Sequence, residues 1–449
     1  MKPTGNAGGV SRRTVLAASA VPAMLGAACR TPATQTPPAA KPGTGKVVVL
    51  SYQSTSPRLD LQIAMYEALN RDLQPAGLEV EFVPTTAADT DVMTKATTFH
   101  AAGTPADLFE WPRLWREIES IIGEVTPYFK RDKLDEKQWI PDSIEAMKDS
   151  EGKLWGLPVT ISADAMAYNL DLFEAAGLKP PPQDPDDRSW TMELFLDYAR
   201  RLTRGNEQFG MESKCTGGVD WMNWPTWFGY GPVDYRNKRV TINTSGFQRG
   251  LQYWIDLQLR HQVWPTADQL NALRATANQD SFLTGKVAMK GIFNLATKPD
   301  FRWGIAAMPY TPSPGEPRNV SARISVHALF MDSTARNKDG AWEVFKYWMR
   351  PETNARYVLS NGHIVSPLLN TRSELTLADF QQKMGADPKA FLLQAQRSRV
   401  DGWRYYLLKD QGKARTEIDK HFTEAKAGKM PVPEFTQRAQ ELTEQLTSF

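Results

Sequence analysis

Cysteine and histidine are scarce in this chain, and their scarcity limits the chemistry that it can support. Its 449 residues include two cysteines, Cys29 and Cys215, and five histidines scattered along the sequence. Zinc and iron–sulfur sites need such ligands clustered at fixed spacing. The sequence also lacks a phosphate loop, a glycine-rich dinucleotide motif and a nucleophile elbow. We therefore expect neither a metal nor a cofactor.

An excess of charge of one sign is also missing. The formal net charge is +2 at pH 7 and the isoelectric point is near 8.3, so the chain lacks the basic footprint of a nucleic-acid-binding protein. Hydrophobic residues make up 41% and charged residues 23% of the chain, as in ordinary globular proteins. Its length allows about two to three domains with sizeable cores. We expect no nucleic-acid partner.

The apolar run near the N-terminus is too short to span a membrane as a helix. It follows Arg12 and Arg13 and ends before Cys29, a pattern typical of a secretory signal, and the arginine pair is similar to a twin-arginine signal. The sequence Leu25–Cys29 resembles a bacterial lipobox, with Leu25 one place farther from the cysteine than is usual. We predict a signal in residues 1–29, a lipid anchor on Cys29, and export to the periplasm or the outer face of the cytoplasmic membrane. A signal that is cleaved without lipidation is the alternative.

Residues 30–45 show no apolar periodicity and are rich in threonine, proline, alanine and lysine. Such a composition buries too little surface to offset the entropy of ordering the chain. The sequence therefore predicts a disordered tether between the anchor and the folded body.

The folded body begins with strands and helices in alternation. Residues 46–50 are a β-branched run typical of a buried strand, and residues 78–83 alternate like a strand. Helical spacing lies between them and again over residues 92–102, and residues 106–111 indicate a further strand. This order is typical of an α/β fold.

Two strand ends in this fold are candidate site positions. In open α/β sheets, ligands collect outside the carboxyl ends of the strands. Tyr52 follows the first strand, and Glu110 and Trp111 end the third.

Farther along the chain, Ser189 or Thr191 is predicted to cap another helix.

Several segments together resemble a known family. They are GKLWGLPVT from Gly152, AYNLDLFEAAGL from Ala167, SWTMELFLDYARRLT from Ser189, DSFLTGKVAMKG from Asp280 and NKDGAWEVF from Asn337. In this order they are similar to the family 1 bacterial extracellular solute-binding proteins, the maltose-binding-protein-like receptors of ABC sugar importers. The resemblance spans roughly residues 46–449.

The resemblance implies a two-lobed α/β fold, the type II periplasmic-binding-protein fold, with a ligand cleft between the lobes. Lobe 1 would take residues 46–160 and about 322–375, and lobe 2 would take about 161–321 and about 376–449. The chain would cross between the lobes near residues 160–164 and 320–326. Hinge closure around a ligand is the motion expected of such a fold.

A sugar cleft needs two kinds of side chain. The C–H face of a pyranose lies well on an aromatic ring, and its hydroxyls need directed hydrogen bonds from polar or charged groups. The resemblance implies aromatic contacts from Trp111, Trp221 and Phe293, and polar contacts near the crossings. Together with the strand-end residues, the residues expected at the ligand site are Trp111, Trp221, Phe293, Asp164, Ser162, Asn294, Glu110, Arg323 and Tyr52. Maltose-binding relatives carry glutamate at the Ser162 position, which argues against maltose itself.

The most aromatic stretch, DWMNWPTWFGYG at residues 220–231, requires its own interpretation. It lacks the basic flanks of a membrane-surface segment. The pair Trp224–Pro225 is interpreted as packing, and Trp227 and Phe228 as a continuation of that core. Trp221, at the edge of the stretch, is predicted to face the ligand.

These observations predict a monomeric receptor that performs no chemistry. Its partners would be a carbohydrate ligand and the permease subunits of an ABC transporter, with membrane contact through the lipid anchor only. One alternative is a receptor for a non-sugar such as a glycerophosphodiester, for which Arg323 is the discriminating residue. The other is an anchored carbohydrate-active enzyme, which needs paired carboxylates or a poised base. Asp107, Glu110 and Asp164 are available, but their spacing does not require such a role.

Overall fold

The computed structural model describes residues 43–52, 58–85, 89–111, 115–213, 220–276, 280–292, 297–311, 324–360, 365–371, 373–399 and 403–449. The predicted signal, the lipid anchor at Cys29 and most of the predicted tether lie outside the described residues. Within the described ranges, no helix combines the length and the apolar character needed to cross a membrane. The same ranges hold no cluster of three or more histidine, cysteine, aspartate or glutamate side chains suited to a metal ion.

A five-stranded sheet forms from the first part of the chain and one returning strand, in the order β2-β1-β3-β11-β4. Its strands are β1 Gly45–Tyr52, β2 Leu78–Thr85, β3 Leu108–Trp111, β4 Leu157–Ala163 and β11 Ile324–Met331. β1 pairs in parallel with β2 and β3, whereas β11 is antiparallel to both β3 and β4. The strands predicted at residues 46–50, 78–83 and 106–111 are therefore confirmed.

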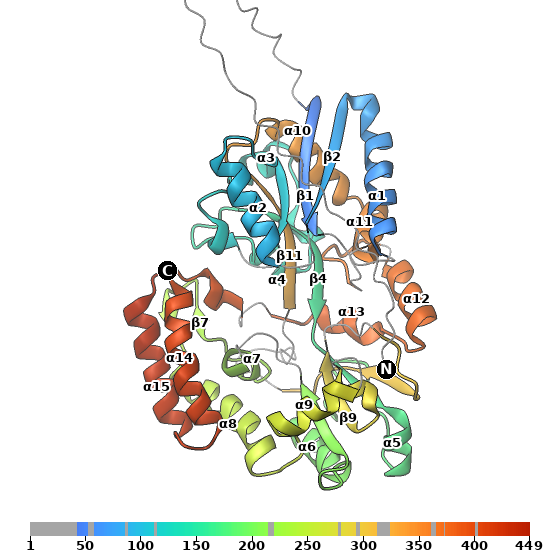
Figure 1. Cartoon of the computed structure of the whole chain (residues 1–449), viewed down its shortest axis with the longest axis vertical. Helices are drawn as coiled ribbons and strands as arrows, with labels where there is room; N and C mark the ends of the chain where they lie inside the picture. The colour runs from blue at the N-terminus through green and yellow to red at the C-terminus, as the bar shows by residue number, and fades with distance from the viewer. Residues whose placement is uncertain are drawn as a thin grey trace, which may run out of the picture. The chain divides into compact units, whose positions relative to one another are not determined.

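Helices α1 Arg58–Leu73 and α2 Asp89–Ala101 connect the first three strands. Parallel strands need such crossover connections, because a short turn cannot return the chain to the same end of the sheet. Val47 and Val49 of β1 are fully buried, as expected for a strand with helices on its faces. Figure 1 shows α1 beside β2, and helix α11 Pro351–Ser360 packs against α1.

A second, four-stranded sheet has the order β10-β5-β9-β6. Its strands are β5 Ala165–Asn169, β6 Phe209–Ser213, β9 Val287–Ile292 and β10 Trp303–Ala306. β5 is antiparallel to β9 and β10, and β6 is parallel to β9. A single residue, Asp164, separates β4 of the first sheet from β5 of the second.

Helix α6 Met192–Arg201 packs closely on β6. Thr191 caps it, because its side-chain oxygen accepts a hydrogen bond from the Leu194 amide at 3.2 Å. Gly210 of β6 lies so close to α6 that an added Cβ would be 1.9 Å from the Ala199 carbonyl oxygen. Only glycine permits this approach of strand and helix.

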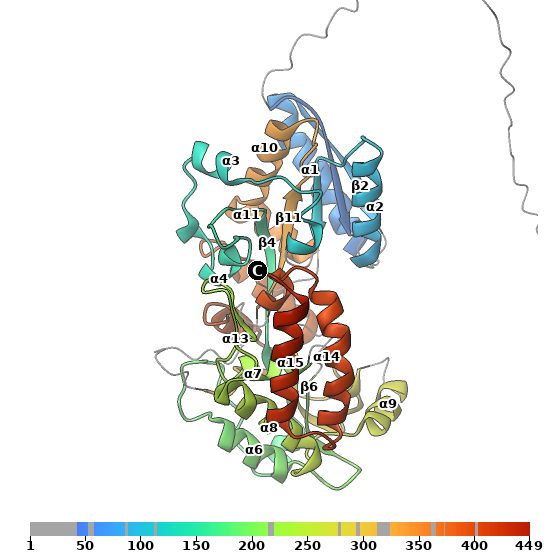
Figure 2. The same cartoon turned by 90° about the vertical axis from the view of Figure 1, so that its left-hand side faces the viewer.

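The C-terminal helices α14 Gln411–Lys426 and α15 Val432–Leu446 pack against each other (Figure 2). α15 also contacts α8 Ser245–Leu259, which packs on α7 Asp220–Thr226. The other described elements are η1 Gln74–Ala76, η2 Trp115–Ile118, α3 Thr126–Arg131, η3 Glu136–Gln138, α4 Pro141–Glu145, α5 Leu170–Ala175, β7 Val233–Asp234, β8 Arg239–Val240, α9 Ala267–Thr276, η4 Ser281–Thr284, α10 Lys338–Trp348, α11 Pro351–Ser360, α12 Ser373–Met384, α13 Lys389–Ala395 and η5 Trp403–Leu407.

Candidate functional site

The strands β4 and β11 extend beyond the other strands of the first sheet. Trp111, the last residue of β3, is level with Ala328 of β11 and thus with Pro158 of β4. β4 continues to Ala163, where it pairs with Ile324. Figure 1 shows this pair of strands leading toward the second sheet. The carboxyl ends of β1 and β3 therefore face the extended part of β4, which is where ligands bind in open α/β sheets.

Asp164 lies at the end of this extension and is 5% exposed. Its Oδ2 atom accepts a hydrogen bond from Trp227 Nε1 at 3.0 Å. The Trp227 ring is 3% exposed and lies 4.2 Å from the Trp224 ring, centroid to centroid. The carboxylate thus connects the chain crossing to the residues that follow α7. Sequence reasoning placed Trp227 in the core and missed this contact, because no local pattern indicates which acceptor a buried indole finds.

Three buried polar side chains near this region have no hydrogen-bond partner among the described residues. They are Trp111 at Nε1, Thr160 at Oγ1 and Asn223 at Nδ2. Thr160 lies on the extended part of β4, and Asn223 precedes Trp227 by about one helical turn. A buried donor without an acceptor costs about 1–3 kcal/mol. Such a cost indicates a place for an outside acceptor, such as a ligand hydroxyl or a water molecule.

Glu110 is 1% exposed and is held inside the first sheet. Ser51 Oγ donates a hydrogen bond to its Oε2 atom at 2.7 Å, and His327 Nδ1 lies 3.9 Å from Oε1. Burial raises the pKa of the Glu110 carboxyl, and the hydrogen bond from Ser51 opposes that rise. Its predicted contact with a ligand stays a prediction.

Trp221 lies among the C-terminal helices in this structure. Its ring is 0% exposed, and Nε1 donates to Asp419 Oδ1 at 3.1 Å. The ring makes edge contacts with Tyr405 and Phe435, with centroid distances of 5.5 and 6.2 Å. The ring is covered on the sides that Tyr405 and Phe435 contact, and its N–H already has an acceptor, so this structure does not support the expectation that it faces a ligand and we leave Trp221 out of the proposed site. Trp224, predicted to be packing, is likewise 0% exposed.

For several predicted site residues the structure gives less detail than for Trp221 and Glu110. Phe293, Asn294 and Arg323 lie outside the described residues. Tyr52 is described only as the last residue of β1. Ser162 is half-buried on β4 and pairs with Ser325.

The carboxylates considered for catalysis already accept hydrogen bonds from the protein. Asp107 accepts bonds from the amides of Val48, Arg336 and Asn337 at 2.9, 2.9 and 3.0 Å. These three hydrogen bonds connect the turn that precedes α10 with strand β1. Glu110 and Asp164 accept from Ser51 and Trp227 as described above. This arrangement suits structural or ligand-binding carboxylates better than a catalytic pair.

Sequence reasoning also missed Arg116, which follows β3 in η2. Its Nε donates to the Leu407 carbonyl oxygen at 2.8 Å, and Nη2 donates to Tyr235 Oη at 2.9 Å. The guanidinium carbon lies 4.5 Å from the Trp115 ring centroid, and that ring stacks on Trp155 at 5.1 Å. A single arginine beside a tryptophan gives no sequence signal of this kind, since its acceptors lie over a hundred residues away in the chain.

Comparison with known proteins gives a consistent result. The profile of the family described as bacterial extracellular solute-binding protein matches residues 66–355. A Brucella abortus protein named as a binding protein is 27% identical over 338 residues, which is 72% of this chain and 76% of that protein.

Two solved structures are similar over 90% of this chain and 99% of their own length. One is an ABC substrate-binding protein from Listeria monocytogenes in complex with cycloalternan, at a TM-score of 0.66 and 18% identity. The other is a cyclic alpha-maltosyl-1,6-maltose binding protein from Arthrobacter globiformis, at a TM-score of 0.68 and 16% identity. This likeness shows the predicted two-lobed α/β fold.

Proposed function

The chain belongs to the bacterial extracellular solute-binding protein family, and from this premise we propose that it is the substrate-binding receptor of an ABC importer. It binds a sugar or oligosaccharide between its two lobes and delivers it to a membrane permease. It performs no chemistry, because the useful event is the preferential binding of ligand by the closed form. The saccharides named for the similar structures support this ligand class.

The unsatisfied indole N–H of Trp111, placed at the carboxyl end of a strand, is the observation that carries the proposal. This side chain ends β3, is 3% exposed, and has no acceptor among the described residues. A hydroxyl group of a sugar can accept that hydrogen bond, and the flat ring suits the C–H face of a pyranose. Asn223 and Thr160 would supply further polar contacts of the same kind.

The proposed site combines these residues with groups at the crossing. Asp164 and Ser162 would contact ligand hydroxyls, with Trp227 holding the Asp164 carboxylate in place. Phe293, Asn294, Arg323, Glu110 and Tyr52 stay predicted contributors. For the lobes we propose residues 46–160 with about 322–375, and about 161–321 with about 376–449, consistent with the membership of β4, β5 and β11 in the two sheets.

We also propose that the protein is exported through the signal in residues 1–29 and anchored by a lipid on Cys29. The family membership supports a location outside the cytoplasm. The body is proposed to act as a monomer, with the permease subunits as its protein partners. A receptor for a non-sugar ligand is the second possibility, and it rests on Arg323, a residue outside the described ranges.

Replacing Trp111 tests the proposal directly. Trp111→Phe keeps an aromatic ring but removes the N–H, so we expect sugar affinity to fall by about tenfold, the equivalent of one well-made hydrogen bond. A thermal-shift screen of mono-, di- and oligosaccharides with glycerol phosphates first identifies the ligand. A ligand at a hundred times its dissociation constant should add about 2.7 kcal/mol to the free energy of unfolding. Calorimetric titration of that ligand then gives the affinities.

Trp139→Phe is the matched control, because the Trp139 indole is also buried without a partner but packs on Phe129 inside the first part of the chain. It should leave affinity unchanged. Equal affinities of wild type and Trp111→Phe would remove Trp111 from the site. Stabilisation by glycerol phosphates alone would favour the non-sugar ligand, and turnover of any sugar would overturn the receptor function.

A further inference from the structure

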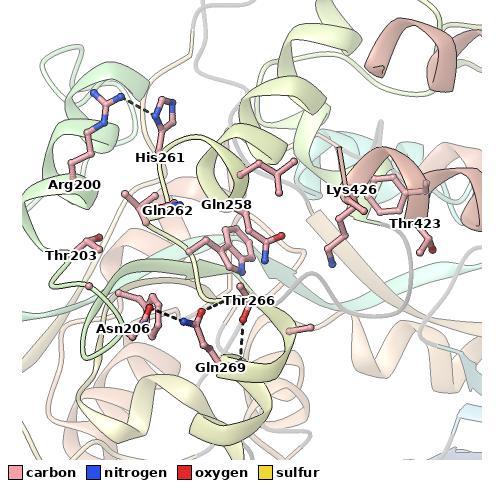
Figure 3. A pocket seen from close by; sticks show the side chains of 18 of the residues that line it. Arg200, Thr203, Asn206, Gln258, His261, Gln262, Thr266, Gln269, Thr423 and Lys426 are labelled. Atoms are coloured by element: carbon pink, nitrogen blue, oxygen red, sulfur yellow. Dashed lines mark hydrogen bonds between the residues drawn. The ribbon is translucent and has the colours of Figure 1, made fainter. Parts of the chain in front are cut away.

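A pocket of about 1220 Å³ opens beside the start of β6, and we name it the distal pocket (Figure 3). It lies between the loop before β6, the end of α8, the start of α9 and the last turn of α14. Asn206, Leu259, Ala267 and Lys426 line it from these four elements. Its volume exceeds the range of about 300–1,000 Å³ that is usual for small-ligand pockets. It therefore has room for more than one sugar ring.

The register of the second sheet separates this pocket from the proposed ligand site. β5 begins at Ala165, directly after Asp164, and Ala165 pairs with Ile292 at the end of β9. β6 is parallel to β9, so Ser213 lies at that same end and Phe209 at the other. Phe209 lines the distal pocket. Phe209, and with it this side of the pocket, is thus removed from the crossing by the length of the strand, about 13 Å.

An indole ring forms part of the pocket wall. Trp264 is half-buried and lines the pocket. Its ring centroid lies 5.6 Å from that of Trp224 and 6.1 Å from that of Trp254, both of which are buried. The next residue is also fixed, because Gln258 Nε2 donates to the Pro265 carbonyl oxygen at 3.2 Å. The buried neighbours hold the ring rigidly, which lowers the entropy cost of stacking a ligand on it.

Side-chain amides of Asn206, Gln258, Gln262 and Gln269 line the same pocket (Figure 3). Gln269 Nε2 donates to Asn206 Oδ1 at 2.9 Å, and Gln269 Oε1 accepts from the Thr266 amide at 2.8 Å. Gln262 is exposed and has a left-handed backbone with φ of 54°, a conformation uncommon outside glycine and asparagine. Amides both donate and accept, so they match hydroxyl groups, which do the same.

The charged groups of the pocket are mostly cationic. Arg200 Nη2 lies 2.9 Å from His261 Nδ1. Burial lowers the pKa of His261, and the nearby Arg200 lowers it further, so the imidazole is neutral at pH 7 and accepts this bond. Lys426 Nζ lies 5.4 Å from the Trp254 ring centroid. Asp419 is the carboxylate among the residues that line the pocket, and its Oδ1 atom accepts a hydrogen bond from Trp221.

We propose that the distal pocket is a second saccharide-binding site, in which a pyranose lies on the Trp264 ring and its hydroxyls bind the amides of Gln262 and Gln269. Arg200 and Lys426 give it a preference for sugars that carry a carboxylate. An apolar ligand would displace water from these polar and charged groups without offering them new hydrogen bonds, which is costly. This site goes beyond the proposed receptor function, since delivery to a permease requires the interlobe site only.

The test uses the full chain and two probes, neutral maltotetraose and acidic trigalacturonate, titrated by calorimetry and followed by saturation-transfer NMR. We expect trigalacturonate binding that persists in Trp111→Ala and weakens at least about tenfold in Trp264→Ala, because the stacking surface is lost. Gln262→Gly, which suits the left-handed backbone, should weaken it about threefold. Gln437→Ala, on the surface of α15, is the control and should change nothing.

The outcomes separate this proposal from the receptor function. Two results would overturn the second site. One is the loss of all trigalacturonate binding in Trp111→Ala, and the other is an unchanged trigalacturonate affinity in both Trp264→Ala and Gln262→Gly. If Trp264→Ala fails to fold because its ring also packs on Trp224, the result for Gln262→Gly decides. A stronger response to maltotetraose than to trigalacturonate in the distal pocket would overturn the role given to Arg200 and Lys426. If the proposed interlobe site is wrong, Trp111→Phe instead binds the sugar found in the thermal-shift screen as tightly as the wild type does.

Discussion

At the scale of single residues, the tryptophans differ mainly in what the indole N–H contacts. Trp221 donates to Asp419, Trp227 donates to Asp164, and Trp111 has no acceptor among the described residues. All three rings are nearly or completely buried. Burial by itself therefore does not distinguish a tryptophan that only packs in the core from one that contacts a ligand. The unsatisfied donor alone does not do so either, because the packing residues Trp139 and Trp224 share it. What distinguishes Trp111 is its position at the carboxyl end of β3, where ligands bind in open α/β sheets.

Glu110 makes the stability of the protein depend on pH. Its pKa is raised by burial, with the Ser51 hydrogen bond opposing. The folded state therefore holds this proton to a higher pH than the unfolded state does. The stabilisation from the protonated carboxyl is complete below the usual pKa of a glutamate and is lost as pH rises through the raised value. Within that window the loss is about 1.4 kcal/mol per pH unit.

Glu110→Gln is expected to remove this part of the pH dependence. The amide keeps the shape of the protonated carboxyl but cannot ionise, so the variant should gain stability relative to wild type as pH rises above the usual glutamate value. Urea unfolding at a series of pH values between about 4 and 8 measures the difference. Glu81→Gln, on the exposed side of β2, is the control. A constant difference between Glu110→Gln and wild type across the series would refute the expectation.

At the scale of elements, local pattern was sufficient where the neighbours in space are neighbours in sequence. The strand expected at residues 78–83 is β2, and the helix expected at 92–102 is α2 with a left-handed Gly103 after it. Thr191, one of two candidate caps, makes the cap bond. Each of these depends on contacts within a few residues, where alternation, helical spacing and capping act.

Local pattern failed where a side chain is placed by a distant segment. Trp221 is covered by Tyr405 and Phe435, which lie far along the chain on elements that a local pattern cannot position. The Trp227–Asp164 bond and the contacts of Arg116 have the same character. The fold class and the crossing region could thus be predicted, but the identity of the ring that faces a ligand could not.

A buried ion network joins the elements of the second sheet. Lys290 of β9 is 2% exposed, and its Nζ lies 3.3 Å from Glu212 Oε2 and 2.6 Å from Asp280 Oδ1. Glu212 of β6 is fully buried and also binds Arg274 Nη2 of α9 at 3.1 Å. The network therefore fixes β6, β9 and α9 to one another. Removing one partner from such a pair leaves a buried charge uncompensated.

Lys290→Met is expected to lower the free energy of unfolding by about 3 kcal/mol, because Glu212 loses its ammonium partner while its contacts with Arg274 and Ser281 stay. Denaturant unfolding measures it. The double variant Lys290→Met, Glu212→Leu should recover much of the loss, since replacing both partners with apolar groups removes the stranded charge. Lys420→Met, whose pair with Glu417 is exposed, should change stability little. A double variant as unstable as the single one would contradict this account.

At the scale of the whole molecule, contacts outside the chain crossing also connect segments that are distant in the sequence. β4 and β5 meet at Asp164, and β11 runs back beside β4. Apart from these strands, Arg116 after β3 binds Tyr235 after β7 and Leu407 at the end of η5. In the proposed division Arg116 belongs to lobe 1 and both acceptors belong to lobe 2, so a motion that separates these lobes would break the two hydrogen bonds. Arg116 therefore favours the conformation in which they are made.

Arg116→Ala is accordingly expected to weaken ligand binding without removing a ligand contact. If the ligand binds best when the lobes are held together, losing the arginine lowers the population of the competent form and reduces affinity by about three- to tenfold. The same variant should show a larger radius of gyration by X-ray scattering without ligand, and saturating ligand should restore the wild-type value. Tyr235→Phe removes only one of the bonds and should have a smaller effect in the same direction. An unchanged radius of gyration with reduced affinity would instead place Arg116 in direct contact with the ligand, and no change in either would remove it from the mechanism of closure.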